Sequence, residues 1–138
     1  DLGWWEPFGP SITRATTTVQ TNVGTKQALL SAVPVGKVRI VTRVVARNAS
    51  ASLAGFSGED GFYFGFDAGA TGSGNLTLSP SAVERLTSTA RLIQSSGDIS
   101  ESVVSVIGAA GEVFGISVAF TSITATVDID VFYYDVDA

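Results

Sequence analysis

The chain contains no cysteine, no histidine and no methionine among its 138 residues. Without cysteine it can form no disulfide and offers no thiolate to a metal ion. Without histidine or cysteine, neither a Ser-His-Asp triad nor a Cys-His pair can be built. We therefore predict that the protein is not an enzyme, that it has no catalytic residues and that it holds no cofactor.

Carboxylates are the remaining side chains that could perform chemistry. Asp128 and Asp130 fall on one side of an expected strand, but a glycosidase needs such a pair in a cleft, with the carboxyl groups roughly 5 to 10 Å apart. Calcium is an alternative, because it takes carboxylate and carbonyl oxygens and needs no histidine. The sequence has no Asp-x-Asp-x-Asp-Gly loop, however, and a solvated acidic surface is the simpler interpretation.

Basic residues are also scarce, since eight Lys and Arg against thirteen Asp and Glu give a net charge of −5. This balance argues against a nucleic-acid partner, because neutralising phosphates normally requires a basic surface. No apolar run approaches the roughly 18 to 20 residues that span a bilayer, so we expect a soluble protein with no membrane partner. A chain of 138 residues is long enough to bury a single core.

The clearest positive signal is the run from Lys37 to Asn48, in which apolar and basic residues alternate. Alternation with a period of two is typical of a β-strand with one buried face. We expect four basic side chains to share the other face, namely Lys37, Arg39, Arg43 and Arg47. These side chains either pair across the sheet with Asp128 and Asp130 or contact an acidic surface of another subunit. A polyanionic ligand is a third possibility.

Short segments rich in threonine, valine and aromatic residues alternate with Gly, Ser and Pro along the chain. They predict strands over residues 12–20, 26–33, 37–48, 62–68, 99–107, 113–121 and 123–136. Pro34 and Gly36 predict a tight turn before residue 37, and in the last strand Val127, Ile129 and Val131 share one apolar face. Pro80, with Ser81 and Glu84 at capping-box spacing, predicts one short helix over residues 80–94. Because nearly all strands lack helical crossovers, the pattern favours an antiparallel β-sandwich or jelly roll, with residues 11–138 forming one domain.

Residues 1–10 differ from the rest, because Trp4, Trp5 and Phe8 lie among glycines and prolines. This composition predicts an extended arm rather than a helix or a central strand. Buried aromatic side chains supply large contact areas, so the arm could anchor the chain to a neighbouring subunit. It could equally fold back over its own core.

Several motifs together resemble small β-sandwich proteins of tailed-bacteriophage particles. They are the opening run Val33-Pro34-Val35-Gly36-Lys37-Val38-Arg39-Ile40-Val41, the triplet Asn48-Ala49-Ser50, the turn Ser96-Gly97-Asp98-Ile99 and the long final strand. The resemblance covers about residues 30–138 and leaves out the aromatic arm and the expected helix. It implies a non-catalytic structural protein on the virion surface, such as a capsid decoration, a head spike or fibre, or a tail component. The implied partners are other virion proteins and further copies of the chain, commonly in a trimer.

An alternative from another class is a carbohydrate- or receptor-binding module used in host attachment. In that case exposed aromatic rings would stack on sugar rings, and the candidates are Tyr63, Tyr133 and Tyr134.

Overall fold

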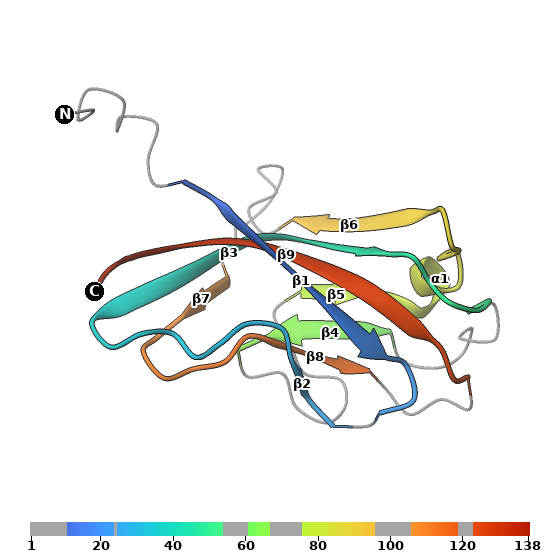
Figure 1. The fold of residues 1–138 in the computed structure, drawn as a ribbon, viewed down its shortest axis with the longest axis horizontal. Helices are drawn as coiled ribbons and strands as arrows, with labels where there is room; N and C mark the ends of the chain where they lie inside the picture. Colours follow the sequence, from blue (N-terminus) through green and yellow to red (C-terminus); the bar gives the residue numbers. More distant parts are fainter. Residues whose placement is uncertain (1–10, 24, 54–60, 67–75, 96–105, 119–122) are drawn as a thin grey trace.

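The computed structural model describes residues 11–23, 25–53, 61–66, 76–95, 106–118 and 123–138. These residues form two antiparallel sheets (Figure 1). The larger sheet has the strand order β1-β9-β3-β6, with β7 also paired to β3, and the smaller sheet has the order β2-β8-β4-β5. The strands are β1 (Thr13–Gln20), β2 (Gln27–Ala28), β3 (Lys37–Arg47), β4 (Phe62–Gly65), β5 (Leu76–Leu78), β6 (Arg91–Ser95), β7 (Val106–Gly108), β8 (Gly115–Val118) and β9 (Thr126–Asp137).

The core lies between the two sheets, which gives the molecule a sandwich-like architecture. From β9 of the larger sheet it takes Val127, Ile129 and Val131, all fully buried, as the alternation of the last strand predicted. From the smaller sheet it takes Phe62 and Phe64, whose rings meet edge to face with centroids 6.5 Å apart. The predicted all-β antiparallel fold is thus confirmed at this level.

The tight turn before β3 forms as predicted. The Lys37 amide donates a hydrogen bond of 3.2 Å to the Pro34 carbonyl oxygen, and Gly36 has a φ of +79°. Glycine adopts this left-handed backbone without a steric penalty, and proline suits the approach to such a turn. The predicted arm over residues 1–10, with Trp4, Trp5 and Phe8, lies outside the described residues.

The predicted helix over residues 80–94 is wrong in its second half. Helix α1 (Pro80–Val83) is a single turn, begun by a hydrogen bond of 3.3 Å from the Ala82 amide to Ser79 Oγ. The Thr87 hydroxyl then accepts a bond of 3.2 Å from the Thr89 amide, which forms a local turn that competes with the helix. The chain continues as β6, because pairing with β3 outweighs a weak helical periodicity.

Strand β3 contains a β-bulge at Thr42. In the register with β9, Val41 is opposite Tyr133 and Arg43 is opposite Phe132, which leaves Thr42 without a paired residue. The Thr42 hydroxyl donates a hydrogen bond of 3.1 Å to the Phe132 carbonyl oxygen. Because successive side chains of a strand point to opposite faces, one extra residue exchanges the faces on its two sides.

The bulge divides the basic residues of β3 between the two faces of the larger sheet. We call the face that packs on the smaller sheet the inner face, and the opposite one the outer face. Lys37 and Arg39 share the inner face with Val41, whereas Arg43 and Arg47 point from the outer face. The prediction of a single face for all four is therefore wrong, since regular alternation was assumed along the whole strand.

Within the described part of the chain, no helix is long and apolar enough to cross a membrane.

Candidate functional site

On the inner face, Arg39 is held by a two-pronged ion pair with Asp135. Its Nε donates to Asp135 Oδ1 at 2.7 Å and its Nη2 donates to Asp135 Oδ2 at 2.9 Å. Its Nη1 donates to the Ser31 carbonyl oxygen at 2.8 Å, and the guanidinium lies 4.6 Å from the centre of the Tyr133 ring. Only 4% of the Arg39 side chain is exposed, so this group clamps the segment before β3 onto the sheet.

The neighbouring pair on the same face is exposed. Lys37 Nζ lies 2.6 Å from Asp137 Oδ1, but 88% of the Asp137 side chain is accessible to water. Exposed pairs of this kind contribute little to stability, because water screens the charges. Hydrogen bonding from Arg39 lowers the pKa of the Asp135 carboxyl, and hydrogen bonding from Lys37 lowers that of Asp137.

On the outer face, Arg47 pairs with Asp130, as one of the three sequence-based alternatives proposed. Arg47 Nε donates to Asp130 Oδ2 at 2.8 Å, and its Nη2 donates to Oδ1 at 3.1 Å. Asp130 is buried and also accepts a bond of 2.6 Å from the Thr16 hydroxyl. The hydrogen bonds from Arg47 lower the pKa of the Asp130 carboxyl, so it is ionised at neutral pH.

Asp128, also on the outer face, is likewise held by hydrogen bonds from neighbouring side chains. It accepts hydrogen bonds of 3.0 Å from Asn48 Nδ2 and 2.6 Å from the Thr18 hydroxyl, and these bonds lower its pKa. Arg47 Nη1 lies 3.7 Å from Asp128 Oδ2. Two carboxyls that are both ionised and that both accept hydrogen bonds on each oxygen suit a structural role rather than paired acid and base catalysis.

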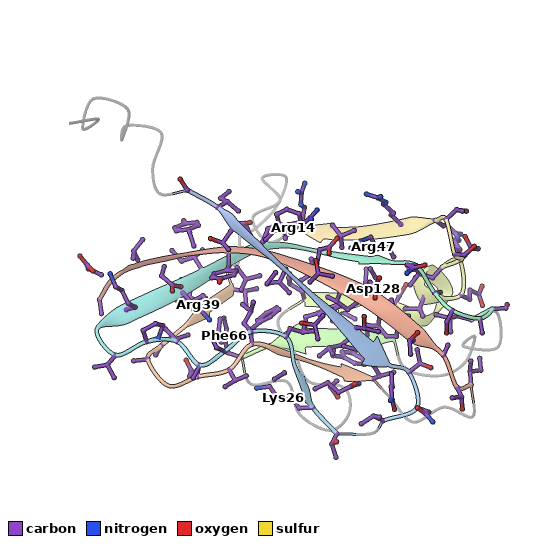
Figure 2. The ribbon with its side chains drawn as sticks, in the orientation of Figure 1. Arg14, Lys26, Arg39, Arg47, Phe66 and Asp128 are labelled. Carbon is purple, nitrogen blue, oxygen red and sulfur yellow. The ribbon has the colours of Figure 1, made fainter. Side chains whose placement is uncertain are left out.

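Two further arginines of the outer face flank an aromatic ring. Arg14 in β1 and Arg43 in β3 are both opposite Phe132 of β9. The Arg43 guanidinium lies 4.2 Å from the centre of the Phe132 ring, in cation–π contact. Both arginines are exposed, and among the described residues neither has a carboxylate at ion-pair distance. Figure 2 shows Arg14 with Arg47 and Asp128 on three neighbouring strands of this sheet.

The bulge also brings apolar side chains to the outer face. Ile40 of β3 is opposite Tyr134 of β9 on one side and Ile107 of β7 on the other. In the next row, Val38 is opposite Val136. We call these five residues the apolar band. Ile107 is 57% exposed, and the other four are partly exposed.

The three tyrosines considered for sugar stacking do not share a surface. Tyr63 lies in β4 of the smaller sheet and alternates with the buried Phe62 and Phe64, so it points away from the core. Tyr133 lies on the inner face beneath Arg39 and packs against the core. Tyr134 belongs to the outer face of the larger sheet, and the structure thus brings no two of them together as a platform.

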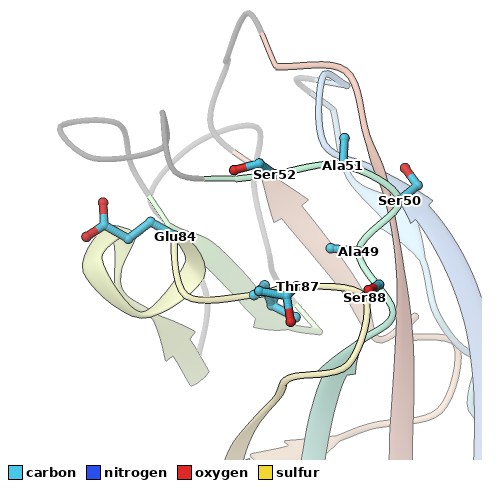
Figure 3. A pocket seen from close by; sticks show the side chains of 8 residues that line it. Ala49, Ser50, Ala51, Ser52, Glu84, Thr87 and Ser88 are labelled. Carbon is cyan, nitrogen blue, oxygen red and sulfur yellow. The ribbon is translucent and has the colours of Figure 1, made fainter.

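Two shallow hollows lie near the end of β3. The first, of about 290 Å³, is bordered by the segment after β3 and by the segment between α1 and β6, as Figure 3 shows. Its lining residues are Ala49, Ser50, Ala51, Ser52, Glu84, Leu86, Thr87 and Ser88. The second, of about 300 Å³, is lined by Arg47, Asn48, Ser88, Thr89 and Arg91. Across the described ranges, no three His, Cys, Asp or Glu residues gather in a group that could hold a metal ion.

Arg14 and Arg91 are outer-face residues that the sequence analysis did not select. Arg14 alternates with Thr16 and Thr18, which is a local signal for a shared face of a strand. Arg91 gave no such signal, because its segment was assigned to a helix and its position depends on pairing with β3.

No protein-family model matches the chain, and neither a curated protein nor a solved structure matches it. The candidate site must therefore be chosen from this molecule alone, and it is the outer face of the larger sheet.

Proposed function

We propose that the protein is a non-catalytic structural subunit that assembles through the outer face of its larger sheet. The observation that carries this proposal is the apolar band, with Ile107 at 57% exposure, beside Arg14 and Arg43, for which the described residues provide no carboxylate at ion-pair distance. An antiparallel sheet normally has one apolar face, which packs on the core, and one polar face, which is exposed to water. A contiguous apolar surface edged by charge is typical of a contact with another protein.

A second copy of the chain is the partner that the charges favour. Among the described residues, the outer face carries four arginines but two aspartates, namely Arg14, Arg43, Arg47, Arg91, Asp128 and Asp130. Since the whole chain has a net charge of −5 and this face one of +2, all other residues of the chain together carry −7. Contact between the basic face of one copy and acidic residues of the next is complementary. Such a head-to-tail contact forms a closed ring when the rotation between successive copies closes, and we propose that it does so in a trimer.

The particle in which such a subunit works is proposed from the sequence resemblance. Small β-sandwich proteins of tailed phages decorate capsids or form head spikes, fibres and tail components. We propose the same location for this chain, on the virion surface, with a jelly-roll arrangement of its strands. The two-sheet architecture and the interaction surface support this role.

Replacing Ile107 with glutamate should dissociate the assembly. The new carboxylate would be desolvated in the contact, because Ile107 is the most exposed member of the apolar band. Light scattering coupled to size exclusion should give a multiple of 14.2 kDa for the wild type, with three copies expected, and 14.2 kDa for Ile107→Glu.

The matched control for this experiment is Val35→Glu. Val35 is the most exposed large apolar residue of the described part, at 95%, but it lies in the turn before β3 rather than on the outer face. The control should therefore assemble like the wild type. A wild-type protein that stays at 14.2 kDa at every concentration would refute self-assembly, and equal dissociation of both variants would refute the choice of face.

A further inference from the structure

A second site lies where β6 meets β3, at the edge of the outer face. Arg91 of β6 is directly opposite Arg47 of β3. Like charges in opposite positions of neighbouring strands destabilise the pairing. Asp130 compensates the charge of Arg47. Arg91, by contrast, is exposed, and the described residues provide it with no carboxylate at ion-pair distance.

The hollow of about 300 Å³ between these two arginines has a polar lining. Its remaining walls are Asn48, Ser88 and Thr89, which add two hydroxyl groups and an amide. Since a water molecule occupies about 30 Å³ of liquid, the hollow has room for a phosphate ion or a single acidic sugar. It lacks an apolar wall, which favours a ligand that is charged and hydrated.

Arg47, which lines this hollow, retains hydrogen-bond donor capacity. Its Nε and Nη2 are bonded to Asp130, but its Nη1 lies 3.7 Å from Asp128 Oδ2, beyond hydrogen-bonding distance. An oxyanion in the hollow could therefore accept from Arg47 Nη1 and from the guanidinium of Arg91. Charge-assisted bonds to a planar guanidinium are the strongest that proteins use for carboxylate and phosphate groups.

The two walls of the hollow are fixed relative to one another. Asn48 follows β3 with a φ of +58°, a left-handed backbone that asparagine tolerates better than most residues. Its side chain is bonded to Asp128, and the next amide, of Ala49, donates to the Thr87 carbonyl oxygen at 3.2 Å. Figure 3 shows Ala49 opposite the segment that carries Thr87 and Ser88. The arginines thus face a site whose shape is already formed before a ligand arrives.

We propose that this hollow binds an oxyanion, either a phosphate group or the carboxylate of an acidic sugar. Arg91 and Arg47 would hold its charge, while the hydroxyls of Ser88 and Thr89 would donate to its remaining oxygens. This site lies apart from the apolar band, and its occupation does not require assembly, although Arg47 and Arg91 also belong to the basic face proposed to contact a second copy.

The test is a titration of the protein with sodium phosphate and, separately, with sodium glucuronate, followed by backbone amide NMR at constant ionic strength. Saturable shifts should appear at residues 47–48 and 88–91 with at least one of the two probes. Saturation by phosphate alone would assign a phosphate ligand, and saturation by glucuronate alone would assign an acidic sugar. Absence of saturable shifts with both probes would overturn the proposal.

Arg91→Gln should weaken this binding about tenfold or more, because it removes a charge-assisted hydrogen-bond donor. Arg91→Lys should keep part of the affinity, since it retains the charge without the planar fork. The matched control is Lys37→Gln, which removes the same charge but lies at the other end of β3, on the inner face and away from the hollow. The control should change the affinity by less than about twofold. An equal loss in Lys37→Gln and Arg91→Gln would overturn the site in favour of a general charge effect.

Discussion

Deletion of Thr42 should lower the free energy of unfolding by at least about 4 kcal/mol, a loss reserved for changes that disrupt a core or a buried charge. Without the bulge, the first half of β3 must turn over relative to the second half. Val41, which is fully buried, would then leave the core, and Arg39 would leave Asp135. Urea denaturation followed by circular dichroism measures this loss.

The control for the deletion is Thr42→Val, which keeps the residue count and therefore the faces of β3. It removes only the hydrogen bond of 3.1 Å from the Thr42 hydroxyl to the Phe132 carbonyl oxygen. A single neutral hydrogen bond is worth about 0.5 to 1.5 kcal/mol. A deletion no more harmful than this substitution would contradict the role assigned to the bulge.

Replacement of Asp135 with alanine should lower the free energy of unfolding by about 3 kcal/mol. This is the lower end of the range for breaking a buried ion pair. The Arg39 side chain is 4% exposed and would be left with a desolvated charge, although Asp135 itself is 24% exposed, which moderates the cost. Asp137→Ala breaks the next pair along the same two strands, where the carboxylate is 88% exposed. That variant should unfold in urea like the wild type, and an equal cost for the two would contradict the clamp.

The same pair predicts how stability changes with acid. Hydrogen bonds from Arg39 hold the pKa of Asp135 below its ordinary value. The pair therefore contributes its full share of the free energy of unfolding above the unfolded-state pKa of about 3.9. This share is lost as the pH falls through the lower pKa of the folded state. The stability difference between wild type and Asp135→Ala should accordingly shrink on acidification below about pH 4. A difference that stays constant down to pH 2 would show that the carboxylate charge plays no part.

Local patterns predicted the parts of the fold that depend on local chemistry. The alternation of Val127, Ile129 and Val131 identified the buried side of β9, and Pro34 with Gly36 identified the turn before β3. In each case the deciding property belongs to residues adjacent in the sequence. Such properties are visible without knowledge of the partner strand.

The bulge at Thr42 and the strand at β6 could not be predicted in this way. Threonine is accepted on either face of a strand, so Thr42 fits an unbroken alternation as well as a bulged one. Residues 91–95 have apolar positions compatible with a helix, and only pairing with β3 makes them a strand. Both features are matters of register between distant segments, which alternation alone does not determine.

The candidate site likewise contains one ion pair that the charge pattern predicted and one that it did not. Pairing of Arg47 with Asp130 was one of three alternatives drawn from charge patterns, and it is observed. Pairing of Arg39 with Asp135 was not predicted, because the bulge exchanges the faces on which the basic side chains lie. The apolar band arises from the same exchange, since Val38 and Ile40 were expected in the core.

The measurement that tests the central claim most directly uses a single introduced thiol, since the chain has no cysteine of its own. Ile107→Cys places a thiol in the apolar band, and Val35→Cys places one in the exposed turn. Maleimide labelling of each variant is timed in dilute and in concentrated protein. If the outer face is the assembly surface, labelling slows with concentration for Ile107→Cys but not for Val35→Cys. Equal rates at both concentrations for Ile107→Cys would contradict the account.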